Sequence, residues 1–331
     1  MHGWIVIDKP VGPGSTQIVS AVKRALREGG YARVKVGHGG TLDPLASGVL
    51  PVALGEATKL AGRMLDARKL YTFTIRFGEE TDTLDAGGDV VARSDVRPTF
   101  AEVEAALPRF AGEIEQMPPV YSALKVAGRR AYALARAGEA PPMKPRRVKV
   151  HSISASPEPV EGRVTRSGPL AAKRASASSA VAVGEAAFTA HVSKGTYIRS
   201  LARDIARALG TVGHVIALRR LRAGPFTLDS AISLDKLGEL AKARRLEQAL
   251  LPLAAGLDDI PALSVTPDQA RLLRQGQKVI GIAAQPGLHL ALDRSVPVAL
   301  VELSEDCLRV VRGFNLDQEE CDDVGDRRAQ D

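Results

Sequence analysis

Hydrophobic and polar positions along this 331-residue chain follow two different periods, which predict both strands and helices. The clearest period of two covers residues 71–77, where an aromatic or aliphatic residue stands at every odd position and a polar one between. This alternation predicts a half-buried strand. A period of 3.6 follows Ser15 and Thr16, and it predicts a helix that one of these two residues caps and that ends at the Gly-Gly pair 29–30.

The same patterns predict further elements along the chain. Strands are expected at residues 4–7, 148–153 and 188–192. Three helices are expected, one that begins at Thr99 with a capping box, one over 201–210 and one over 233–251. A linker is expected at 252–261. A short helix after Thr266 and strands at 288–292, 296–302 and 308–312 form a β-rich C-terminal part.

Two stretches show no such period. Residues 157–184 are rich in Ala, Ser and Gly, a composition typical of a flexible insertion. Residues 317–331 carry seven acids and two arginines, a net charge of −5, and are expected to form a disordered acidic tail.

The composition is that of an ordinary globular protein, with 45% hydrophobic and 25% charged residues. The length suggests about two domains. No apolar run approaches the roughly 20 residues of a membrane helix, and the N-terminus lacks the features of a signal peptide. Cys307 and Cys321 do not form a metal-ligand spacing or a disulfide framework. We therefore expect a cytoplasmic protein that does not associate with membranes.

The charge distribution favours a polyanionic partner such as RNA. The formal net charge is +7, and without the acidic tail the remainder carries +12. Residues 125–149 contain eight basic residues and one acid, Glu139. This run is either a solvated face or an arm that contacts phosphates. The candidate contacts are Arg129, Arg130, Arg146 and Arg147.

A glycine-rich stretch at residues 37–51 contains a single carboxylate, Asp43. The glycines at 37, 39, 40, 48 and 55 allow a positive φ and a close approach of the backbone to a ligand. The apolar residues between them can fix the loop on a core. Asp43 followed by Pro44 can also be a plain turn. The number of glycines around it favours a carboxylate that is presented to a ligand.

This stretch, Gly-His-Gly-Gly-Thr-Leu-Asp-Pro-Leu-Ala-Ser-Gly-Val-Leu-Pro, continues without a gap to Lys59. It closely resembles the catalytic motif of the bacterial TruB family of tRNA pseudouridine synthases, which isomerise the T-loop uridine conventionally numbered 55. The resemblance implies an α+β (mixed α/β) catalytic domain over residues 1–251 with a largely antiparallel central sheet. Residues 258–316 resemble the PUA fold, a small β-rich RNA-binding domain.

The resemblance also implies roles for individual residues. Asp43 matches the nucleophile and Arg199 the arginine that pairs with it. Tyr71 matches the tyrosine that stacks on the target base, and it is a candidate proton acceptor for C5 of the uracil. The implied substrate contacts are His38, Tyr197, the backbone of Leu218, and Lys9, which is otherwise a surface lysine before a turn.

The reaction constrains the chemistry further. Carboxylates serve as covalent nucleophiles in other enzymes, and a carboxylate covered by a nucleotide needs a fixed cation to remain charged. Asp43 can attack C6 of the base, attack C1′ of the sugar, or abstract a sugar proton, and the sequence does not distinguish these routes. The target base must be flipped out of the T loop. We expect no redox cofactor and no metal.

The expected partner is the T-arm of tRNA, bound by a monomer without an obligate protein partner. Two alternatives remain open. One is a guide-RNA-dependent synthase of the archaeal and eukaryotic relatives, which share the aspartate motif. The other is a non-catalytic factor that binds or folds RNA.

Overall fold

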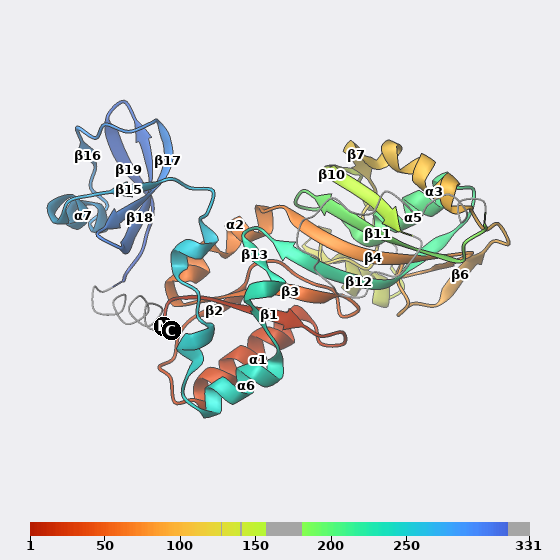
Figure 1. Cartoon of the computed structure of the whole chain (residues 1–331), viewed down its shortest axis with the longest axis horizontal. Coiled ribbons are helices and arrows are strands. Elements are labelled where there is room, and N and C mark those ends of the chain that lie inside the picture. Colours follow the sequence, from red (N-terminus) through yellow and green to blue (C-terminus); the bar gives the residue numbers. More distant parts are fainter. Residues whose placement is uncertain (127, 140, 157–180, 317–331) are drawn as a thin grey trace. The chain divides into compact units, whose positions relative to one another are not determined.

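The structure, a computed structural model, describes residues 1–126, 128–139, 141–156 and 181–316 (Figure 1). Most of the expected insertion at 157–184 and all of the expected acidic tail lie outside the described residues. The chain divides into two compact units. The first contains Met1–Leu42, Val49–Leu65 and the described part of Ala223–Asp331, and the second contains Asp43–Gly48 and Asp66–Arg222.

In the first unit, β1 (Gly3–Lys9) has β14 (Ala231–Ile232) on one side and β3 (Ser47–Leu54) on the other. β2 (Val36–His38) pairs antiparallel with β3. After β3 the chain forms a 3-10 turn, η1 (Gly55–Leu60), and a short helix, α2 (Ala61–Asp66). The helices α1 (Ser15–Glu28) and α6 (Leu234–Lys242) lie side by side (Figure 1). The strand expected at residues 4–7 and the helix after Ser15 are thereby confirmed.

The start of α1 differs from the expectation that Ser15 or Thr16 is the cap. The N-cap residue is Gly14, whose backbone N–H donates to the Gln17 side chain at 2.7 Å. The Ser15 hydroxyl instead accepts from the backbone N–H of Leu42 at 2.8 Å and donates to the Leu42 carbonyl at 3.0 Å. Ser15 therefore fixes the residue immediately before Asp43, a tertiary contact that local capping patterns cannot reveal.

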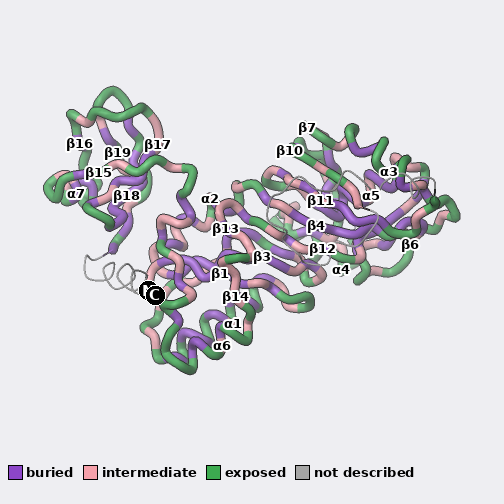
Figure 2. Tube along the Cα trace, viewed as in Figure 1, coloured by how far each residue is buried: buried purple, intermediate pink, exposed green. Residues whose placement is uncertain are grey.

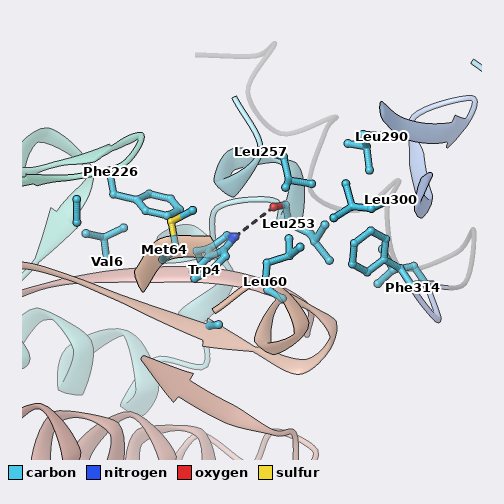
Figure 3. Packing of buried hydrophobic residues seen from close by; sticks show 14 of the residues in the cluster. Trp4, Val6, Leu60, Met64, Phe226, Leu253, Leu257, Leu290, Leu300 and Phe314 are labelled. Atoms are coloured by element: carbon cyan, nitrogen blue, oxygen red, sulfur yellow. Dashed lines mark hydrogen bonds between the residues drawn. The ribbon is translucent and has the colours of Figure 1, made fainter. Parts of the chain in front are cut away.

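A buried cluster around Trp4 forms the core of the first unit (Figure 3). The Trp4 indole N–H donates to the carbonyl of Leu253 at 3.1 Å, and Leu253 and Leu257 are themselves buried in the cluster. Burial of each such side chain contributes roughly 1.5–3 kcal/mol. The prediction of a linker at 252–261 was therefore wrong for its first half, which includes the 3-10 turn η5 (Leu253–Gly256) and packs in the core.

The helix expected over 233–251 is shorter than predicted. α6 ends at Lys242, and Arg244 adopts a left-handed backbone with φ of 54°. An L-residue in this region interrupts the helical hydrogen bonding. The chain resumes as a 3-10 turn, η4 (Leu246–Ala249).

The β-rich C-terminal part is confirmed. Its strand order is β15 (Ala262–Ser264), β17 (Gly287–Asp293), β18 (Val296–Ser304), β19 (Cys307–Gly313) and β16 (Val279–Ile280). The helix α7 (Pro267–Arg274) begins as expected, because the Thr266 hydroxyl accepts from the Gln269 N–H and the Gln269 side chain returns the contact.

In the second unit the strand order is β12 (Gly213–Ala223), β4 (Lys69–Phe77), β11 (Glu185–Val192), β10 (Arg146–Ser156) and β7 (Gly112–Gln116). β4, β11, β10 and β7 pair antiparallel in succession. Buried residues follow β4 and β11 (Figure 2), and the rings of Phe73 and Phe188 stack with centroids 5.2 Å apart. The strands predicted at 71–77, 148–153 and 188–192 are confirmed.

Shorter elements surround this sheet. β5 (Glu79–Thr81) and β6 (Val90–Arg93) form a hairpin, as do β8 (Lys125–Val126) and β9 (Arg129–Arg130). The helices are α3 (Phe100–Ala106), α4 (Ala131–Arg136) and α5 (Ile198–Ala208). α3 has the predicted Thr99–Glu102 capping box. Among the described helices, none is long and apolar enough to cross a membrane.

Candidate active site

The loop that carries Asp43 is a turn that also presents a carboxylate. The Ala46 N–H donates to the Asp43 carbonyl at 3.1 Å, and the Asp43 side chain is 38% exposed. The two sequence interpretations, a turn and a presented acid, are therefore compatible.

Gly48 ends this loop with a positive φ of 101°. Ser47 and Gly48 pair in parallel with Arg219 and Arg220 of β12. A Cβ on Gly48 would lie 2.2 Å from the carbonyl oxygen of Arg220, so only glycine permits this approach. Gly40 and Gly55 also have positive φ, whereas Gly37 and Gly39 do not.

Arg199 lies beside Asp43 and is almost completely buried, with 6% of its side chain exposed. Its Nη2 is 2.8 Å from Asp43 Oδ2, and its Nη1 is 3.3 Å from Asp85 Oδ2. One guanidinium thus contacts two carboxylates. Arg199 is the second residue of α5, where a cation is unfavourable to the helix dipole. The two carboxylates offset that cost.

Backbone carbonyls complete the surroundings of the guanidinium. Nη1 donates to the Thr83 carbonyl at 2.7 Å, and Nη2 donates to the Tyr121 carbonyl at 2.9 Å. The planar guanidinium is therefore held from two loops, and its remaining freedom is small. This arrangement aims one edge of Arg199 at Asp43.

Sequence reasoning missed Asp85. The loop around it, Thr81-Asp-Thr-Leu-Asp-Ala-Gly-Gly-Asp89, reads as turn-rich and polar. In the structure Asp85 is buried, and its Oδ1 accepts from the Thr83 hydroxyl at 2.7 Å and from the Gly87 N–H at 3.0 Å. Nothing in the local pattern distinguishes this acid from Asp82 or Asp89, because the contact that sets it apart is the ion pair with the distant Arg199.

Tyr197 stands at the N-cap of α5, two residues before Arg199. Its N–H donates to the Gln116 side-chain oxygen at 2.8 Å, and its carbonyl accepts from the Gln116 amide at 3.1 Å. Burial and the negative charge of Asp43 raise the pKa of the Tyr197 phenol, while the cations Arg146 and Arg199 oppose this shift. Tyr197 is therefore neutral at physiological pH and lies within electrostatic range of Asp43. Gln116 was not identified from the sequence.

Tyr71 and Leu218 lie on neighbouring strands of the second unit, β4 and β12. Tyr71 is 9% exposed and pairs across the sheet with Ala190. Leu218 is 8% exposed. These positions leave little of either side chain free.

The four arginines of the basic run differ in their surroundings. Arg129 forms an ion pair with Glu139 at 2.9 Å, and Arg130 donates to the Ala123 carbonyl. Arg146 and Arg147 are exposed at the start of β10. The charge of Arg146 lowers the pKa of the Tyr197 phenol, although burial raises this pKa overall. The structure brings Arg199 together with Asp43, and Tyr197 stands two residues before Arg199 at the start of the same helix.

Lys9 and His38 belong to the first unit. Lys9 is fully buried, and its Nζ donates to the Pro10 carbonyl at 2.8 Å, so the interpretation as a surface lysine was wrong. His38 is half-buried in β2 opposite Val52 of β3. In the part of the chain that the structure describes, no group of three or more His, Cys, Asp or Glu side chains is arranged to hold a metal ion.

Comparisons with known proteins agree with this geometry. A family model described as "TruB family pseudouridylate synthase (N terminal domain)" matches residues 27–198, and one described as "tRNA pseudouridylate synthase B C-terminal domain" matches residues 199–258. The chain is 58% identical to the tRNA pseudouridine synthase B of Novosphingobium aromaticivorans, over 96% of this chain and 98% of the relative. It is 57% identical to that of Zymomonas mobilis, over 95% and 96%.

Solved structures resemble the fold. A chain from a Cbf5-Nop10-Gar1 complex aligns with a TM-score of 0.65 and 26% identity, over 95% of this chain and 84% of that one. A chain from an H/ACA RNP bound to a substrate RNA containing 2′-deoxyuridine has the same TM-score at 24% identity, over 95% and 85%. From the two family models and the near full-length relatives, the chain belongs to the TruB family of pseudouridylate synthases.

Proposed function

We propose that this protein isomerises the T-loop uridine of tRNA to pseudouridine and that Asp43 is the reacting carboxylate. The observation that carries the proposal is the asymmetry of the Asp43–Arg199 pair. The aspartate side chain is 38% exposed, whereas its arginine partner is 6% exposed and held from two loops. Asp43 is thus fixed on one side and open to a substrate on the other.

The reaction balances without another reactant. The bond from N1 of uracil to C1′ of ribose breaks, a bond from C5 to C1′ forms, and the proton of C5 is lost while N1 gains one. The composition of the nucleotide does not change. The protein must supply a nucleophile or base, a surface that retains the detached uracil, and an acceptor for the C5 proton.

Arg199 has the same task for each of the three possible actions of Asp43, which are attack at C6, attack at C1′ and abstraction of a sugar proton. In each case the carboxylate must enter the reaction as an anion after the nucleotide has displaced water from it. A guanidinium that remains paired with the carboxylate keeps the charged form favourable in this drier environment. The Asp85 carboxylate and two carbonyls orient that guanidinium.

In this proposal the flipped uracil stacks on the part of Tyr71 that remains exposed, which is 9% of the residue, and such a contact is worth about 1–3 kcal/mol per base. Tyr71 is also our candidate acceptor for the C5 proton. Tyr197 and the backbone of Leu218 contact the nucleotide in this proposal. Lys9 and His38 are further substrate contacts in this proposal, and His38 fills the space that the base leaves in the T loop.

We further propose that the protein acts as a cytoplasmic monomer on the T-arm, without an obligate protein partner. The division into a catalytic domain at 1–251 and a PUA-like RNA-binding domain at 258–316 is part of the same proposal. Arg146 and Arg147 contact tRNA phosphates, and Arg129 and Arg130 contribute after their present partners are exchanged for phosphate.

The test is an assay of the purified protein with an unmodified T-arm transcript that carries tritium on uracil C5. Because the C5–H bond breaks, turnover releases tritium into water. Release without any guide RNA or added protein supports a stand-alone synthase. Release that requires a guide RNA would support the guide-dependent alternative, for which the fold likeness to a chain in an H/ACA RNP is the supporting observation.

Asp43→Asn separates catalysis from RNA binding or folding. The amide keeps the size of the side chain but cannot act as the carboxylate. We expect no detectable tritium release and a tRNA affinity within about tenfold of the parent, or about 1.4 kcal/mol. Turnover at the parent rate would remove Asp43 from the mechanism.

A further inference from the structure

Four consecutive backbone carbonyls, those of residues 121–124, link Arg199 to the first part of the basic run. We call these residues the connector, and β8, β9 and α4 together the arm. The Tyr121 carbonyl accepts from Arg199 Nη2 at 2.9 Å. The next three carbonyls accept from the arm: Ser122 from the Tyr132 N–H at 3.0 Å, Ala123 from the Arg130 guanidinium, and Leu124 from the Ala131 N–H at 2.8 Å.

The Tyr121 carbonyl shares its donor with the proposed reacting carboxylate. Arg199 Nη2 lies 2.8 Å from Asp43 Oδ2, and the same nitrogen donates to the Tyr121 carbonyl. The Arg199 side chain is almost completely buried, so water does not readily replace a carbonyl that moves away. A displacement of the connector therefore changes the contacts of the nitrogen that pairs with Asp43.

The segment before the connector is fixed on α5. The Met117 carbonyl accepts from the Ser200 hydroxyl at 2.8 Å and from Arg203 Nη2 at 3.1 Å, and both donors belong to this helix. Residues 118 and 119 are prolines, whose φ angles are fixed by their rings. Because one end of this stiff segment is held on α5, a pull from the arm acts on the connector itself.

Arg130 is the point at which RNA can act on the connector. It is exposed, as is Arg129 beside it in β9. The Arg129 guanidinium pairs with Glu139 at 2.9 Å, whereas the Arg130 guanidinium donates to the Ala123 carbonyl. A phosphate receives a stronger, charge-assisted bond from a guanidinium than a neutral carbonyl does. RNA on the arm therefore removes a contact from the connector, and such a difference between the free and the bound state is what allows a ligand to shift a conformation.

We propose that the connector positions Arg199 against Asp43, and that RNA bound by the arm acts on this ion pair through the connector. The backbone bonds from Ala131 and Tyr132 keep the connector attached to the arm when Arg130 turns to a phosphate. The arm then influences the rate at which bound RNA reacts as well as the affinity. This inference rests on the proposed isomerase function. The connector acts through Arg199, so its members are positioning residues.

Ala131→Pro tests the attachment of the connector to the arm. Proline lacks the N–H from which Leu124 accepts, and it is tolerated as the first residue of a helix. The preceding Arg130 has φ of −71° and ψ of 134°, which suits the residue before a proline. We expect the single-turnover rate of tritium release from saturating T-arm RNA to fall at least fivefold, with an RNA affinity within threefold of the parent. Ala131→Gly is the matched control, because it perturbs the same position but keeps the N–H, and its rate should stay within twofold.

A second background shows whether the effect passes through Arg199. In Arg199→Lys the nitrogen that the connector positions is gone, so Ala131→Pro should lower the residual rate by less than twofold. Equal rates in the proline and glycine variants, or the full proline effect in the lysine background, would overturn the proposal. No tritium release from the parent would count against the proposed function instead, and the coupling is then decided by a measurement that needs no turnover.

That measurement follows the buried Nε–H of Arg199 by NMR. Its signal is identified by its loss in Arg199→Lys and is followed while a T-stem duplex without its loop is added, which offers phosphates but no base to flip. We expect a saturable shift in the parent and in Arg129→Gln. The shift at saturation should be at least threefold smaller in Arg130→Gln, which has no guanidinium to exchange between the connector and a phosphate. The absence of a shift in the parent at any duplex concentration, or equal shifts in the two arginine variants, overturns the proposed action of RNA on the ion pair.

Discussion

Gln116 and Tyr197 form a reciprocal pair of hydrogen bonds, in which the buried side-chain amide of Gln116 accepts from the Tyr197 N–H at 2.8 Å and donates to the Tyr197 carbonyl at 3.1 Å. Tyr197 caps the helix that carries Arg199. The end of β7 therefore sets the position of the helix that supplies the arginine. Gln116 contacts neither Asp43 nor the guanidinium directly, so we regard it as a positioning residue.

Gln116→Glu should lower turnover more than binding. The new carboxylate can still accept from the Tyr197 N–H but cannot donate to its carbonyl, which leaves a buried acceptor unpaired at a cost of about 1–3 kcal/mol. We expect a 10–100-fold lower kcat, a KM within threefold and a lower Tm. The matched control is Glu115→Gln on the exposed face of β7. An unchanged kcat in a destabilised Gln116 variant would reduce this pair to a purely structural role.

Arg199→Lys tests the geometry of the guanidinium. Lysine keeps the positive charge but cannot contact Asp43, Asp85 and two carbonyls at once. We expect most turnover to be lost while tRNA binding survives. Arg199→Ala should be worse, because it removes both the charge and every contact by which the guanidinium holds Asp43. A rate equal to the parent would reassign Arg199 to phosphate binding.

Asp85→Asn tests the second carboxylate on Arg199. The amide retains the shape of the side chain, and it can still accept from the Gly87 N–H, but it loses the charge that faces Nη1. Arg199 should then be less firmly oriented, and we expect a tenfold or greater decrease in kcat with little change in KM. Asp89→Asn is the control, since Asp89 is exposed in the same loop. Equal effects of the two substitutions would argue against a role through Arg199.

The sequence predicted most reliably those features that are formed by residues close together along the chain. The alternation over residues 71–77, the Thr99 and Thr266 capping boxes and the C-terminal strands are local patterns, and the structure has them. The motif around Asp43 could also be identified from the sequence, because it is a single continuous stretch. These features follow from periodicity and turn chemistry, which one sequence displays directly.

Features that depend on distant contacts were not predictable. Asp85 became identifiable only through Arg199, more than a hundred residues away along the chain. Ser15 was expected to cap a helix, but its hydroxyl bonds the backbone of Leu42 instead. The stretch at 252–261 was expected to be a linker, whereas Leu253 is buried in the cluster around Trp4 and its carbonyl accepts from the Trp4 indole. Composition alone cannot report such partners.

The four arginines of the basic run should differ, in two pairs, in their effect on the salt dependence of tRNA binding. Arg146 and Arg147 are exposed, whereas Arg129 is paired with Glu139 and Arg130 donates to a backbone carbonyl. Replacement of Arg146 and Arg147 by Gln should weaken binding to all tRNAs alike and reduce the slope of log affinity against log salt by about one for each phosphate that the variant no longer neutralises. Replacement of Arg129 and Arg130 should change the slope less. An unchanged slope in both variants would return the whole run to a solvated face.

Lys69 provides a prediction about pH. It is buried at the start of β4, and burial together with the charge of Arg220 lowers its pKa from 10.5 to about 8. Below pH 8 the lysine is charged in both the folded and the unfolded chain, so the cost of burying it is fully present. Between pH 8 and 10.5 the folded chain loses this proton while the unfolded chain keeps it, and the contribution of Lys69 to the free energy of unfolding therefore rises with pH.

Lys69→Met removes this dependence, because methionine is similar in length and cannot be charged. The variant should gain stability relative to the parent at pH 7, by at most about 3 kcal/mol for a shift of this size. The advantage should shrink as the pH rises through 8 toward 10.5. The measurement is the difference in Tm between variant and parent at pH 7, 8.5 and 10, with the exposed Lys125→Met as the control that should show no such trend. A difference in Tm that stays constant over this range would mean that Lys69 keeps its proton in the folded protein and that its neighbours compensate for its burial.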